Sequence, residues 1–259
     1  MKYTFIFTFL LVFTFAHAQN NPTYSGKFES IDRLITQPSL YRNASGAPTK
    51  AYWQQRVDYA IKARMDEETN VLTGTETITY YNNSPDDLSY LWVQLDQNIN
   101  NKENDGFNYL FNNISEEMSS LTMQRLLRPV DFPSGVIINS IKDSQGRELK
   151  YIVNNTMMRV NLQETLASNS SMTFTIQWAY SITDRSRYLL SREGYEYFPE
   201  DDNKVFLLGH WYPRVATYSD TEGWHTRQFQ KLGEFQLEFG DYDVELTVPA
   251  DHIVAGTGA

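Results

Sequence analysis

Two neighbouring stretches, RVDYAIKARM (residues 56–65) and VLTGTETITYYN (residues 71–82), decide the fold class. Polar and apolar residues alternate along both, and a period of two places the two sets on opposite faces of a β-strand. The side chains expected on the buried faces are Val57, Tyr59, Ile61, Ala63, Met65, Leu72, Ile78 and Tyr80. The polar stretch DEETN joins the two segments, so the sequence predicts a β-hairpin.

The same alternation continues along the chain. Further strands are expected at residues 88–98, 135–143, 147–153, 157–162 and 171–183, with shorter ones between residues 204 and 215. Gly146 suits the turn before one of them because glycine accepts a positive φ. A single short helix is expected at residues 115–127. At least eight strands and almost no helix predict an all-β domain, either a large curved antiparallel sheet or a β-sandwich.

The last 27 residues, GEFQLEFGDYDVELTVPADHIVAGTGA (233–259), predict one more long strand. Phe235, Leu237 and Phe239 alternate in one phase, whereas Tyr242 and the apolar residues after it alternate in the other. A phase change at a glycine inside a strand is typical of a β-bulge, so a bulge is expected at Gly240.

The N-terminus, MKYTFIFTFLLVFTFAHAQN, has the layout of a secretory signal peptide. Lys2 precedes an apolar run from Tyr3 to Phe15, and Ala16-His17-Ala18 forms an A-x-A cleavage pattern. The alternative is a membrane anchor, but the run is shorter than the roughly 20 residues that a bilayer span needs. We therefore expect a signal peptide at residues 1–18, a polar leader at 19–50 and a β domain at 51–259. The chain would be exported to the periplasm, the cell surface or the medium.

Composition narrows the classes of partner. The chain of 259 residues has a formal net charge of −10, which disfavours nucleic acid and anionic membranes as partners. It has no cysteine, so an exported form needs an ordinary core rather than disulfides. Aromatic residues make up 14%, a share typical of strand-rich, well-packed domains.

No catalytic motif is present in this sequence. There is no H-E-x-x-H, no G-x-S-x-G and no glycine-rich phosphate loop. A metal site made of His210, His225 and a carboxylate is one interpretation, but packing beside neighbouring aromatic residues is the favoured one. Acidic runs such as Glu116-Glu117 would suit a glycosidase only if two carboxylates faced each other across a cleft. The sequence therefore assigns no catalytic, cofactor-binding or metal-binding residue.

Three loops rich in aromatic residues remain: EGYEYFP (193–199), GHWYPRV (209–215) and DTEGWHTRQF (220–229). They would suit a platform that binds sugar or peptide. The favoured interpretation is that their aromatic side chains hold long loops against a sheet.

The stretch from residue 59 to residue 98 resembles the opening of the aminopeptidase N family of zinc peptidases, the gluzincins. The matching residues are Gly74, Ile78, Tyr80, Asn82, Ser84, Pro85, Asp86, Leu88, Leu95 and Asn98. HWYPRVATYSDTEGW (210–224) and residues 233–258 are similar to an exported bacterial branch of that family. The resemblance covers residues 51–259 and implies the family's saddle-like N-terminal β domain.

The family places a thermolysin-like catalytic domain after this β domain, with zinc held by H-E-x-x-H and a distant Glu. The resemblance thus implies a chain truncated before its catalytic domain, inactive alone, whose zinc belongs to the missing part. Its partners would be its own catalytic domain and, in the intact enzyme, a peptide substrate. Many members contribute a Gln from the β domain to the substrate's amino terminus, but no Gln matches near WYPRVATYSD.

Loops near the C-terminal end of the β domain would contact the missing catalytic domain. The residues expected at this interdomain surface are Trp211, Tyr212, Arg214 and Trp224. The alternative function, from a different class, is a freestanding secreted β-sandwich that binds polysaccharide or protein. Strand pattern and composition fit both.

Overall fold

The computed structural model describes residues 38–101, 119–120, 135–187, 193–230, 234 and 236–258. The predicted signal peptide, the first part of the leader and nearly all of the helix predicted at 115–127 lie outside these residues. Within the described ranges, no helix has the length and apolar character that crossing a membrane requires.

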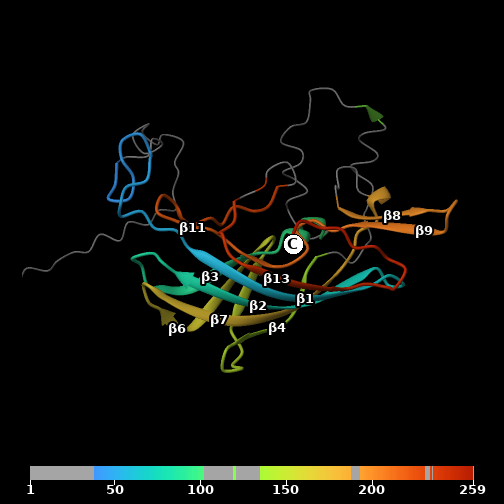
Figure 1. Ribbon diagram of the computed structural model, residues 1–259, viewed down its shortest axis with the longest axis horizontal. Coiled ribbons are helices and arrows are strands. Elements are labelled where there is room, and N and C mark those ends of the chain that lie inside the picture. The colour runs from blue at the N-terminus through green and yellow to red at the C-terminus, as the bar shows by residue number, and fades with distance from the viewer. Residues whose placement is uncertain are drawn as a thin grey trace, which may run out of the picture.

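The chain folds into two main β-sheets (Figure 1). The five-stranded sheet has the order β13 (Tyr242–Thr247), β1 (Arg56–Asp66), β2 (Val71–Asn82), β7 (Ser170–Ser181) and β4 (Ile137–Asp143). The four-stranded sheet has the order β10 (Arg214–Val215), β3 (Leu88–Gln94), β6 (Met157–Leu166) and β5 (Tyr151–Asn154). Two hairpins pair β8 (Gly194–Phe198) with β9 (Asn203–Leu207) and β11 (Tyr218–Ser219) with β12 (Gly223–Trp224). Short 3-10 turns form at η1 (Asp96–Asn100) and η3 (Arg185–Arg187), and the all-β prediction is confirmed.

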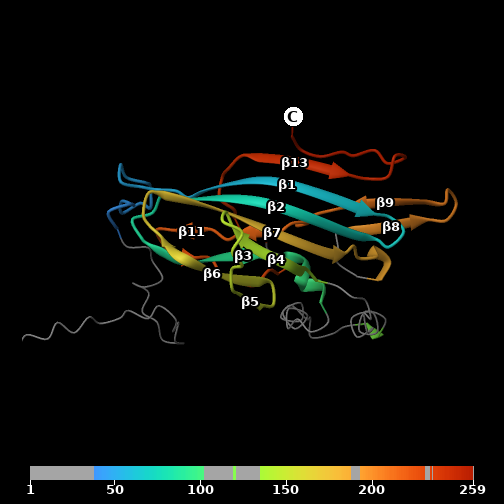
Figure 2. The same ribbon diagram turned by 90° about the horizontal axis from the view of Figure 1, so that it is seen from below.

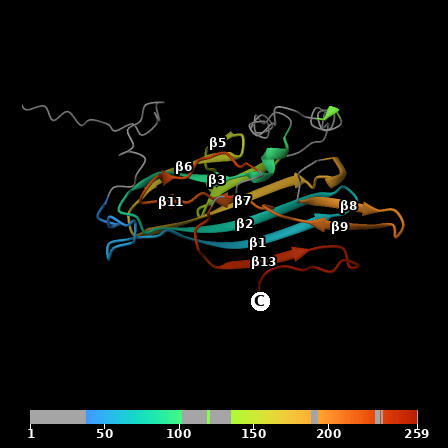
Figure 3. The same ribbon diagram turned by 90° about the horizontal axis from the view of Figure 1, so that it is seen from above.

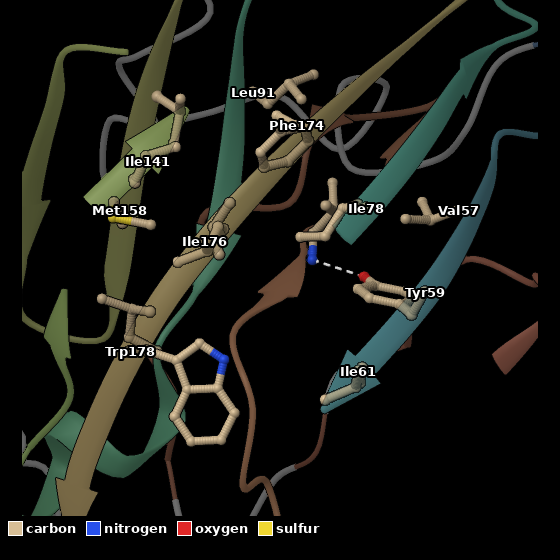
Figure 4. Packing of buried hydrophobic residues seen from close by; sticks show 14 of the residues in the cluster. Val57, Tyr59, Ile61, Ile78, Leu91, Ile141, Met158, Phe174, Ile176 and Trp178 are labelled. Carbon is tan, nitrogen blue, oxygen red and sulfur yellow. Dashed lines mark hydrogen bonds between the residues drawn. The ribbon is translucent and has the colours of Figure 1, made fainter. Parts of the chain in front are cut away.

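The predicted buried faces are confirmed. β1 and β2 form the expected antiparallel hairpin, and all eight side chains assigned to its buried face are at most 6% exposed. They join side chains of β3, β6 and β7 in one core between the two sheets (Figure 2). Figure 4 shows Phe174 and Ile176 of β7 beside Ile78 of β2 in this core.

Gly74 has a packing role at the centre of the five-stranded sheet. It pairs with Trp178 across β2 and β7, and the indole lies over the glycine backbone. A Cβ at Gly74 would lie 2.2 Å from a carbon of that ring, far inside van der Waals contact. Trp178 is 1% exposed, so its ring has no free space into which it could move.

Asn82 closes the other end of β2. Its side chain is fully buried and makes six hydrogen bonds. Oδ1 accepts from Gln55 and from the backbone and hydroxyl of Ser84, while Nδ2 donates to three main-chain carbonyls. Like Gly74, Ile78 and Tyr80, Asn82 belongs to the motif that carries the family resemblance. In this chain those four motif residues are buried in the core.

The last strand differs from the sequence prediction in three ways. β13 is shorter than expected, and it pairs with β1 in parallel rather than antiparallel orientation. The predicted bulge at Gly240 is wrong, because the bridge from Arg56 to Phe239 and the pair Tyr59–Tyr242 keep the same offset. The apparent phase change arises because Glu238, not Phe239, is buried. Gly240 is needed for a close approach instead, since its Cβ would meet the Val57 carbonyl oxygen.

The described end of the predicted leader is fixed to the β domain. Arg42 donates from Nε and Nη2 to the carboxylate of Asp220, at 2.7 and 2.9 Å. The side chain of Asp220 is 1% exposed, so this pair joins residues near 42 to the β11–β12 hairpin.

Candidate interdomain surface

The apolar face of β13 continues the core face of the five-stranded sheet. Directly paired residues of adjacent strands lie on one face of a sheet. Tyr242, Val244 and Leu246 pair in this way with Tyr59, Ile61 and Ala63 of β1. We call Tyr242, Val244 and Leu246 the β13 strip.

The β13 strip is uncovered although it lies on the core face. Its three side chains are 45%, 43% and 39% exposed, whereas their partners on β1 are at most 4% exposed. β13 is the outermost strand of its sheet (Figure 3). Among the described strands, none pairs with the outer edge of β13. The segment after β13 adds two exposed apolar side chains, Ile253 and Val254.

Tyr212 connects the predicted surface to the β13 strip. Its ring lies edge-on to Tyr59 at 5.6 Å and to Tyr242 at 6.2 Å, while Tyr59 and Tyr242 stack at 4.9 Å. Burial raises the pKa values of Tyr59 and Tyr212 well above the ordinary range, so both stay neutral hydroxyls. The Tyr59 hydroxyl accepts the backbone N–H of Val215, the bond drawn in Figure 4.

The two predicted tryptophans pack inward. Trp211 lies against Trp178, and Trp224 packs against Tyr218, Tyr80 and Tyr90. Both indoles are half-buried. The prediction that aromatic residues hold these loops against the sheet is confirmed.

Arg214 is also turned inward. It forms an ion pair with Asp96, and the two side chains are 13% and 3% exposed. Burial lowers the pKa of the guanidinium. Arg214 therefore joins β10 to η1, at the end of β3. Of the four predicted surface residues, Tyr212 is the one whose ring contacts the β13 strip.

His210 and His225 lie against different partners. His210 Nδ1 is 2.8 Å from Glu193 Oε1, and its ring packs on Phe229. His225 Nε2 is 2.9 Å from the Ser219 hydroxyl. Their contacts agree with packing beside aromatic and polar groups. The described residues offer no H-E-x-x-H ligand set, so no zinc-dependent step is derived for this chain.

The fold and this surface define a class: an all-β domain of two packed sheets whose C-terminal edge strand leaves an apolar face open. The sequence predicts the β13 strand but not that one of its faces is exposed. The alternation of Tyr242, Val244 and Leu246 predicts a buried face, and only the sheet order places that face beyond the cover of the second sheet.

Comparisons with known proteins do not define a family for this chain. Neither a family model nor a curated protein matches the sequence. Among solved structures, a mutant M1 zinc metallopeptidase from Deinococcus radiodurans bound to a Tyr-Ser-Ala substrate aligns with a TM-score of 0.41 and 15% identity. The alignment covers 80% of this chain and 35% of that one.

Two further structures align less closely. The M1 zinc metallopeptidase from Deinococcus radiodurans gives a TM-score of 0.40 and 13% identity, with 80% and 35% of the two chains covered. Leukotriene A4 hydrolase from Saccharomyces cerevisiae gives 0.29 and 8%, with 49% and 15% covered. The chain thus spans about a third or less of these proteins. Likeness at this level carries no argument about activity.

Proposed function

We propose that this chain is the non-catalytic N-terminal β domain of an exported zinc-dependent aminopeptidase-like metallopeptidase. Its catalytic domain would cover the β13 strip, and the two domains together would shape a cleft for peptide N-termini. The observation that carries the proposal is the uncovered strip itself. It adds to the sequence resemblance, which rests on the core residues of β2 and on the segment from residue 210 onward.

The β13 strip would form one part of a larger contact between domains. Interfaces between domains of one chain bury roughly 600–1,500 Å². Covering a few hundred Å² of apolar surface contributes several kcal/mol at about 25 cal/mol per Å². That energy is comparable to the whole stability of a domain. A chain with the strip uncovered should therefore gain stability from its covering domain.

The test supplies the downstream polypeptide in trans. We expect it to bind this chain and to raise the midpoint of urea unfolding, because burial of the β13 strip favours the folded state. Val244→Asp should weaken this binding by at least about tenfold, since it places a charge in the apolar contact. Thr75→Asp is the matched control, because Thr75 is exposed on the opposite face of the same sheet.

Binding is measured by sedimentation and calorimetry. If the chain is a stable monomer that ignores the downstream polypeptide, the interdomain proposal fails. The freestanding binding module for polysaccharide or protein would then be the better interpretation. If Val244→Asp and the unchanged chain bind the downstream polypeptide equally well, the contact lies elsewhere on the domain and not on β13.

Export is part of the same proposal. The signal layout of residues 1–18 supports cleavage between Ala18 and Gln19. We expect protein recovered from the periplasm or medium of an exporting host to begin at Gln19, as read by mass spectrometry of its N-terminal peptide. An exported product that still begins at Met1 or Lys2 would contradict the cleavage. A substitution of Ala18 by a bulky residue should retain the precursor.

A further inference from the structure

The β1–β2 turn and the segment after β13 bring three metal-ligating side chains together. Glu67 comes from the turn, while Asp251 and His252 follow β13. One ligand atom from each lies within 4.8 Å of the other two. The histidine ring is only 17% exposed, and it packs on Phe206 of β9 at 5.8 Å. None of the three residues belongs to the β13 strip or to the four residues expected at the interdomain surface.

The imidazole is arranged as a metal ligand would be. Nδ1 lies 3.2 Å from Asp251 Oδ1, so a neutral ring donates its N–H there and keeps the lone pair on Nε2. Nε2 is buried without a hydrogen-bond partner and faces Glu67 Oε2 at 3.8 Å. A lone pair and a carboxylate oxygen are both acceptors, so their approach is unfavourable unless a proton or a metal ion lies between them.

We propose that Glu67, Asp251 and His252 bind one divalent transition-metal ion, with Zn²⁺ preferred, and that this ion ties the segment after β13 to the β1–β2 turn. One imidazole and two carboxylates suit Zn²⁺, whereas Ca²⁺ takes six to eight oxygen ligands. Ligands of one tetrahedral zinc lie roughly 3.3 Å apart, given bonds of about 2.0–2.1 Å. The pair Glu67–His252 is already close to that separation.

The third ligand and the nearby charge are compatible with this site. Asp251 is 83% exposed, so its carboxylate has room to leave Nδ1 and reach the ion, and its hydrogen bond to the ring is then replaced by a bond to the metal. Lys204 is the neighbouring cation, but its ammonium donates to the Glu67 main-chain oxygen and to Asn70 Oδ1. Its charge is therefore held by the turn, and the Glu67 carboxylate remains available as a ligand.

Calorimetric titration of the chelator-treated mature chain with zinc chloride tests the site. We expect one-to-one binding, a rise in the thermal midpoint with zinc and little response to calcium. His252→Ala and Glu67→Gln should each weaken zinc binding by at least about tenfold. His225→Ala is the matched control, a half-buried histidine on another loop, and should bind zinc as the unchanged chain does.

Cobalt absorption and metal-free stability complete the test. Co²⁺ should give the visible bands of a four-coordinate site, and His252→Ala should abolish them. The unfolding midpoint without metal shows that each variant is folded. The proposal is overturned if zinc does not bind below about 1 mM. It is equally overturned if His252→Ala binds zinc as well as the unchanged chain. If His252 is instead a protonated imidazolium held between the two carboxylates, zinc should not bind below about 1 mM.

Discussion

Replacing Asn82 by Leu is expected to leave the chain largely unfolded at 25 °C. The side chain is fully buried, and Leu has nearly its shape but none of its six hydrogen bonds. Three main-chain carbonyls lose their hydrogen-bond donor. The bond to the Leu166 carbonyl is fully buried, and the other two are partly buried. The buried Ser84 hydroxyl and Gln55 amide lose an acceptor. Each orphaned buried group costs about 1–3 kcal/mol, so a total of roughly 5 kcal/mol approaches the stability of a domain.

Urea unfolding monitored by tryptophan fluorescence measures this loss. Asn83→Leu is the matched control, because Asn83 is the exposed neighbour and its side chain makes one hydrogen bond, to the Gln54 carbonyl. It should cost no more than about 1 kcal/mol. Equal stability of Asn82→Leu and Asn83→Leu would show that the hydrogen bonds of the Asn82 side chain do not hold β2 in place.

The second large effect is a loss of stability as pH rises toward neutrality. Glu238 is 7% exposed, and burial raises its pKa from 4.5 to about 7. Its carboxyl accepts the backbone N–H of Tyr218, which offsets only part of that cost. The folded state holds the proton up to about pH 7, whereas the unfolded chain releases it near 4.5. Stability therefore falls as pH rises through this window, by about 3 kcal/mol for this group.

Glu238→Gln should remove that part of the decline and stabilise the chain at pH 8 by about 3 kcal/mol. The measurement is the free energy of unfolding in urea at intervals from pH 4.5 to 8. Glu164→Gln is the control, since it removes a carboxylate that is 79% exposed. A second buried carboxyl, Glu76, has neither oxygen hydrogen-bonded, and burial raises its pKa well above the ordinary value. Glu238→Gln should therefore keep a shallower decline, and Glu76→Leu in the same chain should reduce it further.

If Glu238→Gln and the unchanged chain have the same pH dependence, the carboxyl is solvated in solution. The segment around residue 238 would then not be packed against Tyr218 as described. A rise in stability over the same interval, followed by both variants, would contradict the assignment of both buried carboxyls.

Much of the fold could be predicted from the sequence, because the alternation in β1, β2 and β7 directly reports a half-buried strand. Gly146 likewise takes the expected positive φ, of 78°. What could not be predicted depends on long-range partners. Glu238 is a polar residue on a buried face, so it interrupts the alternation of polar and apolar residues. The interruption looks like the phase change of a β-bulge. The parallel pairing of β13 and its lack of cover follow from the order of strands, which local periodicity does not encode.

The candidate sites likewise include features that local sequence predicts and features that depend on distant segments. Trp211 and Trp224 pack as expected for bulky rings in loops, which need a surface to lie against, while their place at an interdomain surface stays a prediction. The β13 strip and the cluster around His252 required knowing which segments meet. His252 is the last of the four histidines in the sequence and has no other histidine near it, while Glu67 lies in an ordinary acidic turn.

The parallel pairing of β1 with β13 also determines when the sheet can be completed during synthesis. Lys62 and Glu245 are bonded across this pair although 183 residues separate them. β1, β2, β7 and β4 have all left the ribosome well before β13 emerges, so in that interval β1 is an open sheet edge. Forming so distant a pair is slow, because the long loop must close before any contact rewards it. The strand that joins last is also the least buried strand of the five-stranded sheet, which makes it the first of these strands to detach when the sheet opens locally.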